Sequence, residues 1–529
     1  MQDALRAPAE KRARCGASWE RVAGPVLLIG SVIVAYGVAI PNFFVSDDLD
    51  MLSGDASDLF WPAAGFGRFM PLAGAVHRSL AGLAGLNPIP AHTLQVALHA
   101  SCVLAVYALA RAVRLGRAQA LAAALLFALY PRHHQVVMWF GAVSIGLAAA
   151  LVLATALLFL RAWGRDDARA GWLAVVTYTG ALLAHESAVA TPLLLAALAL
   201  YERRSGPGHP LTAPPRWLWA MGAVMLVHLG LVAWAYQTRA ALYPDSGYRF
   251  IGLGSELAAT ALHYAARLVA PPPWTEPLTE GPLGLVLGLL VLLAGGWGLW
   301  RGSARVRLGL GWAALAAAPF VLFGVYGVTD RYSYLPSVGV ALALAGLRIA
   351  PRWLGASALA AYSAGAILLL GQAAAEWRAA GDTVRATMAY LAGWAEAHRL
   401  AGAPPEAVLF IGVPFKRGER WPGSQVYVFS TGLVGAAHLA TGAPGLRVSY
   451  LFADEQPSLS AHLAGLPPAP GPPGLHLLAL DTVPPTDYTA VLGTVLPELA
   501  AQRWRGASRT PVDWARYLGE DRQSAGARR

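Results

Sequence analysis

Long apolar blocks separated by short polar breaks run through the first 370 or so residues of the chain. An α-helix needs roughly 20 mostly apolar residues to cross a bilayer, and most of the blocks approach that length. Of the 529 residues, 56% are hydrophobic and only 13% are charged, whereas a soluble protein carries about 25% charged residues. The pattern therefore predicts an all-α polytopic membrane bundle with about 11 transmembrane helices.

Arginine residues gather at alternate breaks between the apolar blocks, which orients the predicted bundle. The tail 1–21 is basic, and three apolar blocks that return to the side of the N-terminus end at Arg111, Arg161 and Arg301. The positive-inside rule therefore places the N-terminus in the cytoplasm. The predicted spans lie at about 22–44, 93–112, 118–129, 139–160, 171–184, 189–201, 217–236, 283–300, 308–326, 338–349 and 354–370.

Two segments of the predicted transmembrane domain, residues 22–371, do not look like spans. The outer loop at about 45–92 is long enough for one or two amphipathic helices in the membrane interface. The segment at about 250–270 mixes apolar residues with Glu256, His263 and Arg267, which is typical of an interfacial helix.

The composition changes after the last span. A helical connector is predicted at 372–402, and a small extracytoplasmic α/β domain at 403–518, before a disordered tail at 519–529. Its four predicted strands are 408–411, 425–429, 446–451 and 475–480.

Charge and cysteine usage exclude several functions. The net charge of +10 comes from arginines at predicted cytoplasmic turns, so it does not indicate a nucleic-acid partner. Cys15 and Cys102 are the two cysteines, and we expect no disulfide between them. The sequence contains no P-loop, dinucleotide fingerprint, CxxC or HExxH motif.

The adjacent carboxylates Asp47 and Asp48 follow the first span directly. Two acids at this depth are costly to place, and desolvation and mutual repulsion can tune their pKa values. A solvated acidic loop is the plainer interpretation, because only some of the acids whose pKa values are perturbed belong to functional sites.

Further polar groups fall on the same predicted outer face. His133, His134, His185 and Glu186 could form a metal site, although two adjacent histidines cannot point the same way on a regular helix. The alternative is that these histidines hydrogen-bond lipid headgroups. Glu186 stands between two apolar runs, which is expensive unless the carboxylate faces a cavity or a partner.

Arg331 lies between further polar and aromatic residues of this face, Asp330, Tyr332 and Tyr334. A guanidinium group suits bidentate phosphate binding. Arg331 with Tyr332 and Tyr334 could equally form an ordinary aromatic and basic anchor at the membrane interface. Both interpretations stay open from the residues alone.

Together these stretches resemble the GT-C superfamily of membrane glycosyltransferases, with most likeness to bacterial relatives of the protein O-mannosyltransferases and to the TMTC proteins. The likeness covers about residues 40–345. The segments that carry it are 42–48, 67–72, 92–99, 126–137, 182–189 and 331–337. The chain departs from the usual pattern at Tyr130, Gln135 and His185, and no TPR array follows.

The resemblance implies a hexosyl- or pentosyltransferase in a bacterial-type inner membrane. Such an enzyme moves a sugar, with inversion, from a polyprenyl-phosphate donor to a protein, lipid or glycan hydroxyl outside the cytoplasm. It implies no required cofactor, and a divalent metal remains open. The implied site residues are Asp47 or Asp48 as general base, Arg331 and Arg68 on the donor phosphate, and His133, His134, His185, Glu186, Tyr332 and Tyr334 around the donor.

Other functions remain compatible with the sequence. A transporter or flippase of lipid-linked glycans would need polar groups spread through the depth of the bundle, and here they gather on one face. A lipid A or O-antigen transferase would differ only in its acceptor. A catalytically inactive GT-C scaffold, binding a partner through its C-terminal domain, is favoured by the departures at Gln135 and His185.

Overall fold

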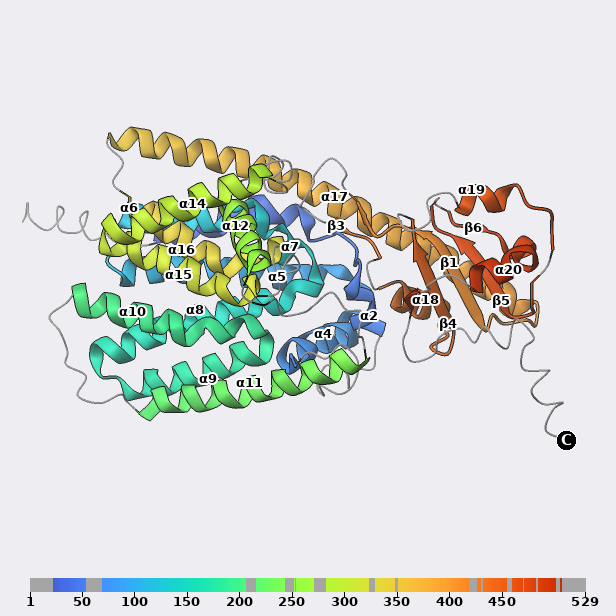
Figure 1. Ribbon diagram of the computed structural model, residues 1–529, viewed down its shortest axis with the longest axis horizontal. Coiled ribbons are helices and arrows are strands. Elements are labelled where there is room, and N and C mark those ends of the chain that lie inside the picture. Colours follow the sequence, from blue (N-terminus) through green and yellow to red (C-terminus); the bar gives the residue numbers. More distant parts are fainter. Residues whose placement is uncertain are drawn as a thin grey trace, which may run out of the picture.

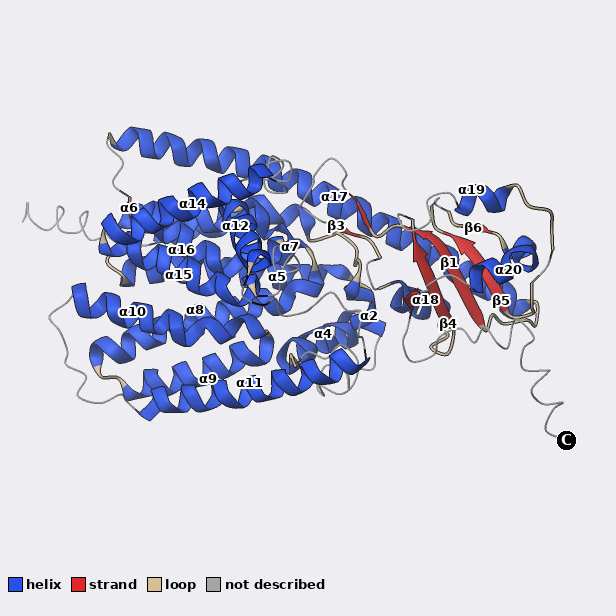
Figure 2. Ribbon diagram, in the orientation of Figure 1, coloured by secondary structure: helices blue, strands red, loops and turns tan. Residues whose placement is uncertain are grey.

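A helical bundle and a smaller sheet region follow each other along the chain (Figure 1; Figure 2). The computed structural model describes residues 22–53, 69–205, 216–242, 252, 254–270, 282–322, 329–347, 351–417, 426–429, 432–453, 459–469, 471–481, 484–500 and 505–506. Figure 2 shows that the bundle is helical throughout, whereas strands lie in the sheet region, which we define as residues 407–506.

The long helices of the bundle follow the predicted order. They are α5 (Pro88–Ala112), α6 (Arg117–Ala128), α8 (Val143–Arg165), α9 (Ala168–Ala184), α10 (Thr191–Ser205), α11 (Arg216–Leu242), α12 (Ser255–Val269), α14 (Pro282–Arg301), α15 (Ala304–Val321), α16 (Tyr334–Ala345) and α17 (Arg352–Leu400). The described residues include 6 helices long and apolar enough to cross a membrane: 22–39, 88–112, 140–165, 216–234, 282–301 and 352–400. The membrane class is thus supported, and the count of about 11 spans stays a prediction.

Large apolar side chains cover the outside of the bundle, as a lipid-facing surface requires. Trp219 is 70% exposed and Leu293 is 61% exposed. In a water-soluble protein a surface of this kind would be a large apolar patch, which soluble monomers rarely carry.

Helix α17 differs from the prediction of a span at 354–370 followed by a separate connector at 372–402. It is one continuous helix of 49 residues, about 74 Å long at 1.5 Å per residue. Its sequence contains no proline, so no residue interrupts the backbone hydrogen bonds. Figure 1 shows it running from the bundle to the sheet region, where the Trp394 ring lies 5.1 Å from that of His476.

Short helices occupy the polar breaks between the long ones. They are η1 (Gly37–Ala39), α2 (Asp47–Ser53), α4 (Pro71–Ala84), η2 (Pro131–His133), α7 (His134–Met138), η3 (Phe140–Ala142), η4 (Glu186–Ala190) and η6 (Asp330–Ser333). Proline begins α4 and η2, where its missing N–H would have had no intrahelical partner. Helices α2 and α4 lie within the predicted outer loop, whose place in the membrane interface stays a prediction, and residues 54–68 between them lie outside the described part.

The sheet region contains a mixed five-stranded sheet, in which the three central strands are parallel and a short antiparallel strand pairs at each edge. Its strands are β1 (Ala407–Val413), β4 (Arg447–Phe452), β5 (Leu475–Ala479), β6 (Thr486–Asp487) and β7 (Arg505–Gly506), in the order β6-β5-β1-β4-β7. The central strand β1 pairs in parallel with β4 and β5 and is buried along its whole length, which explains its unbroken apolar sequence. A separate ribbon pairs β2 (Lys416–Arg417) with β3 (Val426–Tyr427), the remnant of the strand predicted at 425–429.

The two faces of the sheet bury different sets of side chains. Val408 and Phe410 belong to the core that also contains residues of α18 (Leu433–Thr441) and the bundle, whereas Leu409 and Ile411 pack with α19 (Leu459–Ala464) and α20 (Leu492–Ala500). Successive side chains of a strand point to opposite faces, so β1 joins both cores. The sheet region is therefore packed against the rest of the protein through one face.

Helices α15 and α16 approach each other at a pair of glycines. A Cβ atom on Gly309 would lie 2.5 Å from the Ala343 backbone nitrogen, and one on Gly339 would clash with the Ala313 nitrogen and the Gly309 oxygen. Small residues permit this close approach, which drives helix association in lipid.

We predict that Gly309→Ala lowers the free energy of unfolding by about 1–3 kcal/mol, because the added methyl overpacks the contact with α16. Gly311 is the matched control, since it lies on the same helix with open space around its Cα. Gly311→Ala should be neutral or slightly stabilising through helix propensity. Thermal unfolding in detergent measures both, and equal stability of the two variants would contradict the prediction.

Candidate functional site

Turns from distant parts of the chain meet at the end of the bundle that faces the sheet region (Figure 1). The turn η2 contacts η6, α7 contacts both, and η4 contacts α15 and α8. Helix α2 lies at the same end and contacts η3, α4 and α18. The sequence placed the same groups on one predicted face.

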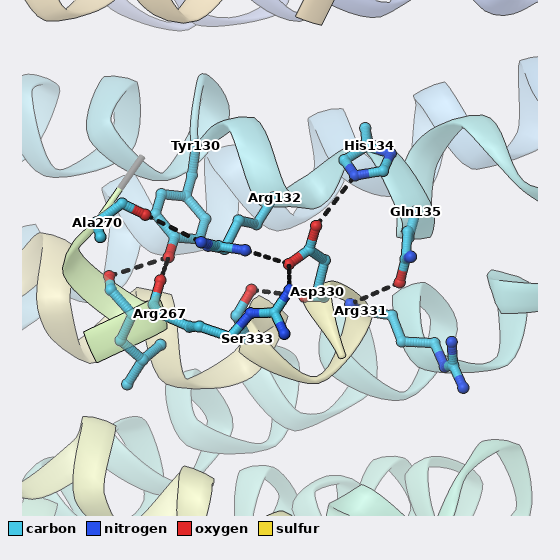
Figure 3. A network of polar contacts seen from close by, with 10 residues as sticks. Tyr130, Arg132, His134, Gln135, Arg267, Ala270, Asp330, Arg331 and Ser333 are labelled. Carbon is cyan, nitrogen blue, oxygen red and sulfur yellow. Dashed lines mark hydrogen bonds and ion pairs between the residues drawn. The ribbon is translucent and has the colours of Figure 1, made fainter. Parts of the chain in front are cut away.

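A buried carboxylate, Asp330, lies at the centre of a network of polar contacts among these turns (Figure 3). Its Oδ1 accepts a hydrogen bond from Arg132 Nη1 and lies 3.7 Å from Arg267 Nη2, and its Oδ2 accepts from His134 Nε2 at 3.2 Å. The Ser333 hydroxyl donates to the Asp330 carbonyl at 2.6 Å. Each charged group therefore has a partner of opposite charge or a hydrogen-bond donor, as a buried ion requires.

Arg132 is buried although it is one of the largest polar side chains, with 1% of its surface exposed. Its Nη2 donates to the Ala270 carbonyl at 3.1 Å, and the Tyr130 hydroxyl donates to the Leu268 carbonyl at 2.9 Å. These carbonyls belong to the C-terminal end of α12, where no intrahelical donor remains. Arg132 thus joins η2, η6 and the end of α12.

The hydrogen bonds of His134 fix its tautomer. Trp377 Nε1 can only donate, and it lies 3.0 Å from His134 Nδ1, so Nδ1 is the acceptor and Nε2 carries the proton given to Asp330. His133 instead lies with its Nε2 2.9 Å from the Ser337 hydroxyl. The adjacent histidines therefore point to different partners. In the described part of the chain, no group of three or more His, Cys, Asp or Glu residues is placed to hold a metal.

The cluster carries two guanidinium groups and one carboxylate. Burial alone would raise the pKa of Asp330, but Arg132, the His134 hydrogen bond and Arg267 outweigh burial and hold that pKa well below its ordinary value. A cavity of about 10 Å³ adjoins the cluster, lined by Arg132, Tyr264, Arg267, Leu268, Thr329, Asp330 and Ser333. It has room for about one water molecule.

The side chain of Arg331 points away from Asp330 (Figure 3). Its backbone N–H donates to Gln135 Oε1 at 3.1 Å, and its guanidinium carbon lies 5.4 Å from the Trp139 ring centre and 4.9 Å from that of Tyr332. These are cation–π distances. Gln135 and the two rings therefore hold the turn and the direction of Arg331.

The His185–Glu186 motif lies beside the same turn. His185 Nδ1 accepts from the Ser187 amide at 3.1 Å, and its ring centre is 6.4 Å from that of Tyr332. Glu186 is 29% exposed, with Oε2 3.9 Å from His185 Nε2. Glu186 is thus the accessible acid of this motif.

The two tyrosines of the predicted site, Tyr332 and Tyr334, pack against other side chains inside the bundle. Tyr332 stacks on Phe320 with ring centres 4.4 Å apart, and its carbonyl accepts from the Tyr264 hydroxyl at 2.8 Å. The Tyr334 hydroxyl lies 2.7 Å from His99 Nδ1 inside the bundle. Both rings are buried.

The acidic pair lies in α2, and its two members differ. Asp48 is completely buried, and its Oδ2 accepts from the Val45 amide at 3.0 Å. Asp47 is half-buried and its Oδ1 accepts from the Ser46 hydroxyl at 2.8 Å. Burial raises the pKa of Asp48 well above its ordinary value, although the Val45 and Gly141 amides lower it in part. The interpretation of a solvated acidic loop does not hold for Asp48.

The turn at 139–142 lies between the acidic helix α2 and the cluster formed by Arg132, Arg267 and Asp330. The Gly141 amide favours the ionised form of Asp48. Two residues earlier along this turn, the Trp139 ring stacks on that of Trp377 from α17, with ring centres 6.2 Å apart. Trp139 also contacts Arg331. Arg68, the remaining predicted site residue, lies outside the described residues.

Arg132, Arg267 and Trp377 were absent from the predicted site. One signal was present in the sequence, because an arginine at the outer end of a predicted span, such as Arg132, runs against the positive-inside rule. Such a residue needs a buried partner or a function. The partner could not be read from the sequence, since it lies 198 residues further along the chain.

Comparisons with known proteins give only distant likeness. No family model and no curated protein sequence matches the chain. Similar solved structures include the oligosaccharyltransferase AglB from Archaeoglobus fulgidus with an inhibitory peptide and a dolichol-phosphate (14% identity, 84% of this chain, 71% of that chain, TM-score 0.45). They also include ArnT from Cupriavidus metallidurans bound to undecaprenyl phosphate (14%, 86%, 92%, 0.46) and an Archaeoglobus fulgidus oligosaccharyltransferase with Zn and sulfate (13%, 83%, 69%, 0.42).

Two of these three structures are named as oligosaccharyltransferases. TM-scores of 0.42 to 0.46 at 13–14% identity assign no role to any residue.

We predict that Asp330→Asn lowers the free energy of unfolding by about 3–5 kcal/mol at pH 7, because it leaves Arg132 buried without its counter-charge. Since the folded pKa of Asp330 is depressed, its contribution is complete above the unfolded pKa of about 3.9 and is lost as the pH falls below it. Thermal unfolding against pH should show the gap to wild type narrowing below about pH 4. Asp382→Asn, at a 62% exposed carboxylate on α17, is the control and should change little.

In contrast to Asp330→Asn, Asp48→Asn should not lower the stability of the protein at pH 7. The folded pKa of Asp48 is raised by burial, so its ionisation opposes folding above the unfolded pKa. The amide oxygen of asparagine can still accept from Val45. We therefore expect equal or greater stability at pH 7, with the difference from wild type vanishing towards pH 4. A clear loss of stability at pH 7 would contradict this prediction.

Proposed function

We propose that the protein is a GT-C-type membrane glycosyltransferase that moves a sugar from a polyprenyl-phosphate donor to an extracytoplasmic hydroxyl acceptor, with inversion. The observation that carries the proposal is the meeting of an acidic helix and a cationic cluster at one end of a membrane bundle. The turn at 139–142 links them, through Gly141 beside Asp48 and Trp139 beside Arg331. The sequence resemblance supports the same activity.

The acidic helix supplies the general base. Asp47 is half-buried and therefore accessible to an acceptor, whereas Asp48 is completely buried and its raised pKa favours the protonated form. Asp47 would take the proton of the acceptor hydroxyl as that oxygen forms a bond to the sugar C1. The bond from C1 to the phosphate oxygen breaks on the opposite side, and polyprenyl phosphate leaves with the electron pair. A positioned base contributes about 10²–10⁴-fold to such a step.

The arginine side chains at η6 and beside it supply the positive charge that the leaving phosphate requires. Arg331 is the group proposed to contact the phosphate, since its side chain points away from Asp330 (Figure 3) and lies over the Trp139 and Tyr332 rings. Arg132 instead fixes η6 through Asp330, and so sets where Arg331 stands. His185, whose ring centre lies 6.4 Å from that of Tyr332, and its neighbour Glu186 would orient the donor sugar. Arg68 would add a second phosphate contact.

The proposal includes the orientation inferred from the arginine pattern. The N-terminus would lie in the cytoplasm, with about 11 spans over residues 22–371. The sheet region would lie outside the cytoplasm, within the proposed domain 403–518. A bacterial-type inner membrane carries lipid-linked donors of this kind, and the acceptor is a protein, lipid or glycan.

The activity test uses the purified protein in detergent with a panel of polyprenyl-phosphate sugars. We expect release of polyprenyl phosphate by wild type and a loss of about 10²-fold or more in Asp47→Asn, the size of a lost general base. Asp48→Asn should retain more activity than Asp47→Asn. Asp382→Asn, on the exposed face of α17, serves as the control. Binding of donors without release in wild type would favour the inactive scaffold, and equal activity of all variants would remove Asp47 from the mechanism.

A further inference from the structure

Helix α18 of the sheet region begins without a cap of its own. Its N-cap residue is Gly432, which has no side chain, and no side-chain hydrogen bond is made there. The amide of Gly435, three residues on, instead donates to Oδ1 of Asp50 at 2.9 Å. This is the amide that an N-cap Asp, Asn or Ser normally satisfies. Asp50 of α2 therefore caps α18 from 385 residues away.

The charge of Asp50 also suits this position. The first turn of a helix carries a partial positive charge from its free N–H groups, so a carboxylate is favoured there. Gly435 is the third residue of a nine-residue helix, well within that turn. The contact thus combines a hydrogen bond with a favourable charge–dipole interaction.

Glycine is required at both contact positions of α18. A Cβ atom on Gly432 would clash with the Ser46 carbonyl oxygen, and one on Gly435 would lie 2.5 Å from the Leu49 carbonyl. The backbones of α2 and α18 therefore touch directly. No side chain larger than hydrogen fits between them without displacing one helix.

A third contact fixes the start of α2. The Ser46 amide donates to the Val428 carbonyl at 2.8 Å, and Ser46 has a φ of 53°, in the left-handed region that only some residues tolerate. Ser46 precedes Asp47, whose carboxylate its hydroxyl contacts. The sheet region therefore holds the acidic helix on both sides of Asp47, through Ser46 and through Asp50.

We propose that the sheet region is a positioning unit for the acidic helix, with Asp50 as the positioning residue that sets where Asp47 stands. The catalytic part of this inference rests on the proposed function, in which Asp47 is the base. The attachment of α2 to the sheet region rests on the contacts between them and does not depend on the proposed function. Hydrogen exchange tests this docking role, and enzyme kinetics test the positioning role.

The docking is tested by amide hydrogen exchange of the full-length protein, over peptides that cover 47–53 and 433–441. Asp50→Ala removes the cap, and we expect exchange of both peptides to rise about fivefold, the effect of a lost N-cap. Asp50→Asn keeps an oxygen acceptor and should restore most of the protection. Unchanged exchange of both peptides in Asp50→Ala would overturn the docking role, whatever the activity of the protein.

A second pair of variants tests the close approach independently of charge. Gly435→Ala should raise exchange in the peptide 47–53 as well as in its own helix, because the methyl separates α18 from α2. Gly445→Ala is the matched control, since Gly445 lies a few residues beyond α18 with open space around its Cα. An equal response to both alanines would contradict the direct backbone contact.

The positioning role is read from kinetics on a donor that the wild type turns over. We expect kcat of Asp50→Ala to fall about tenfold or more with little change in the KM for donor, since a displaced base slows chemistry without touching the donor. Asp50→Asn should recover most of the loss. Raised exchange with unchanged kcat would overturn the positioning role and leave the docking contact alone.

Discussion

A carboxylate that stays ionised when buried needs cations and hydrogen-bond donors around it, and Asp330 imposes this constraint on the end of the protein that holds the candidate site. Its partners come from segments around residues 132, 134 and 267, and His134 is held in turn by Trp377. Removing any one partner leaves a charge or donor in a medium that solvates it poorly. Four separate parts of the chain are therefore fixed relative to one another, and the geometry of Arg331 follows from them.

The three acids of α2 show how the environment decides the role of identical side chains. Asp48 is buried against backbone amides and its pKa is raised, Asp47 remains half-buried, and Asp50 caps a helix of the sheet region. They stand within four positions of one another in the sequence. Asp48 points about 100° away from Asp47 around the helix, whereas Asp47 and Asp50, three positions apart, share one side. Burial and packing partners therefore give the three acids of one short helix three different surroundings.

The repeating features of the fold could be predicted from the sequence, because they depend on neighbouring residues. Apolar blocks predicted the order of the long helices, and the apolar run at 408–411 predicted the strand β1. The continuity of α17 was missed because the apolar pattern ends near Leu370, although nothing in the backbone stops the helix there. Arg132 and Gly435 were missed for another reason: their meaning lies in the partners Asp330 and Asp50, which only the folded chain brings to them.

Aromatic side chains join the sheet region, the acidic helix and the arginines beside Asp330 into one unit. Trp139 contacts Arg331 on one side and Tyr427 of the sheet region on another, with ring centres 5.4 Å apart in the second pair. Trp377 of α17 stacks on Trp139 and donates to His134. A displacement of the sheet region would therefore reach Asp330 through rings and hydrogen bonds in contact, and not only through α2. Two routes thus connect the sheet region to the site, one through the backbone of α2 and one through the aromatic side chains beside Arg331.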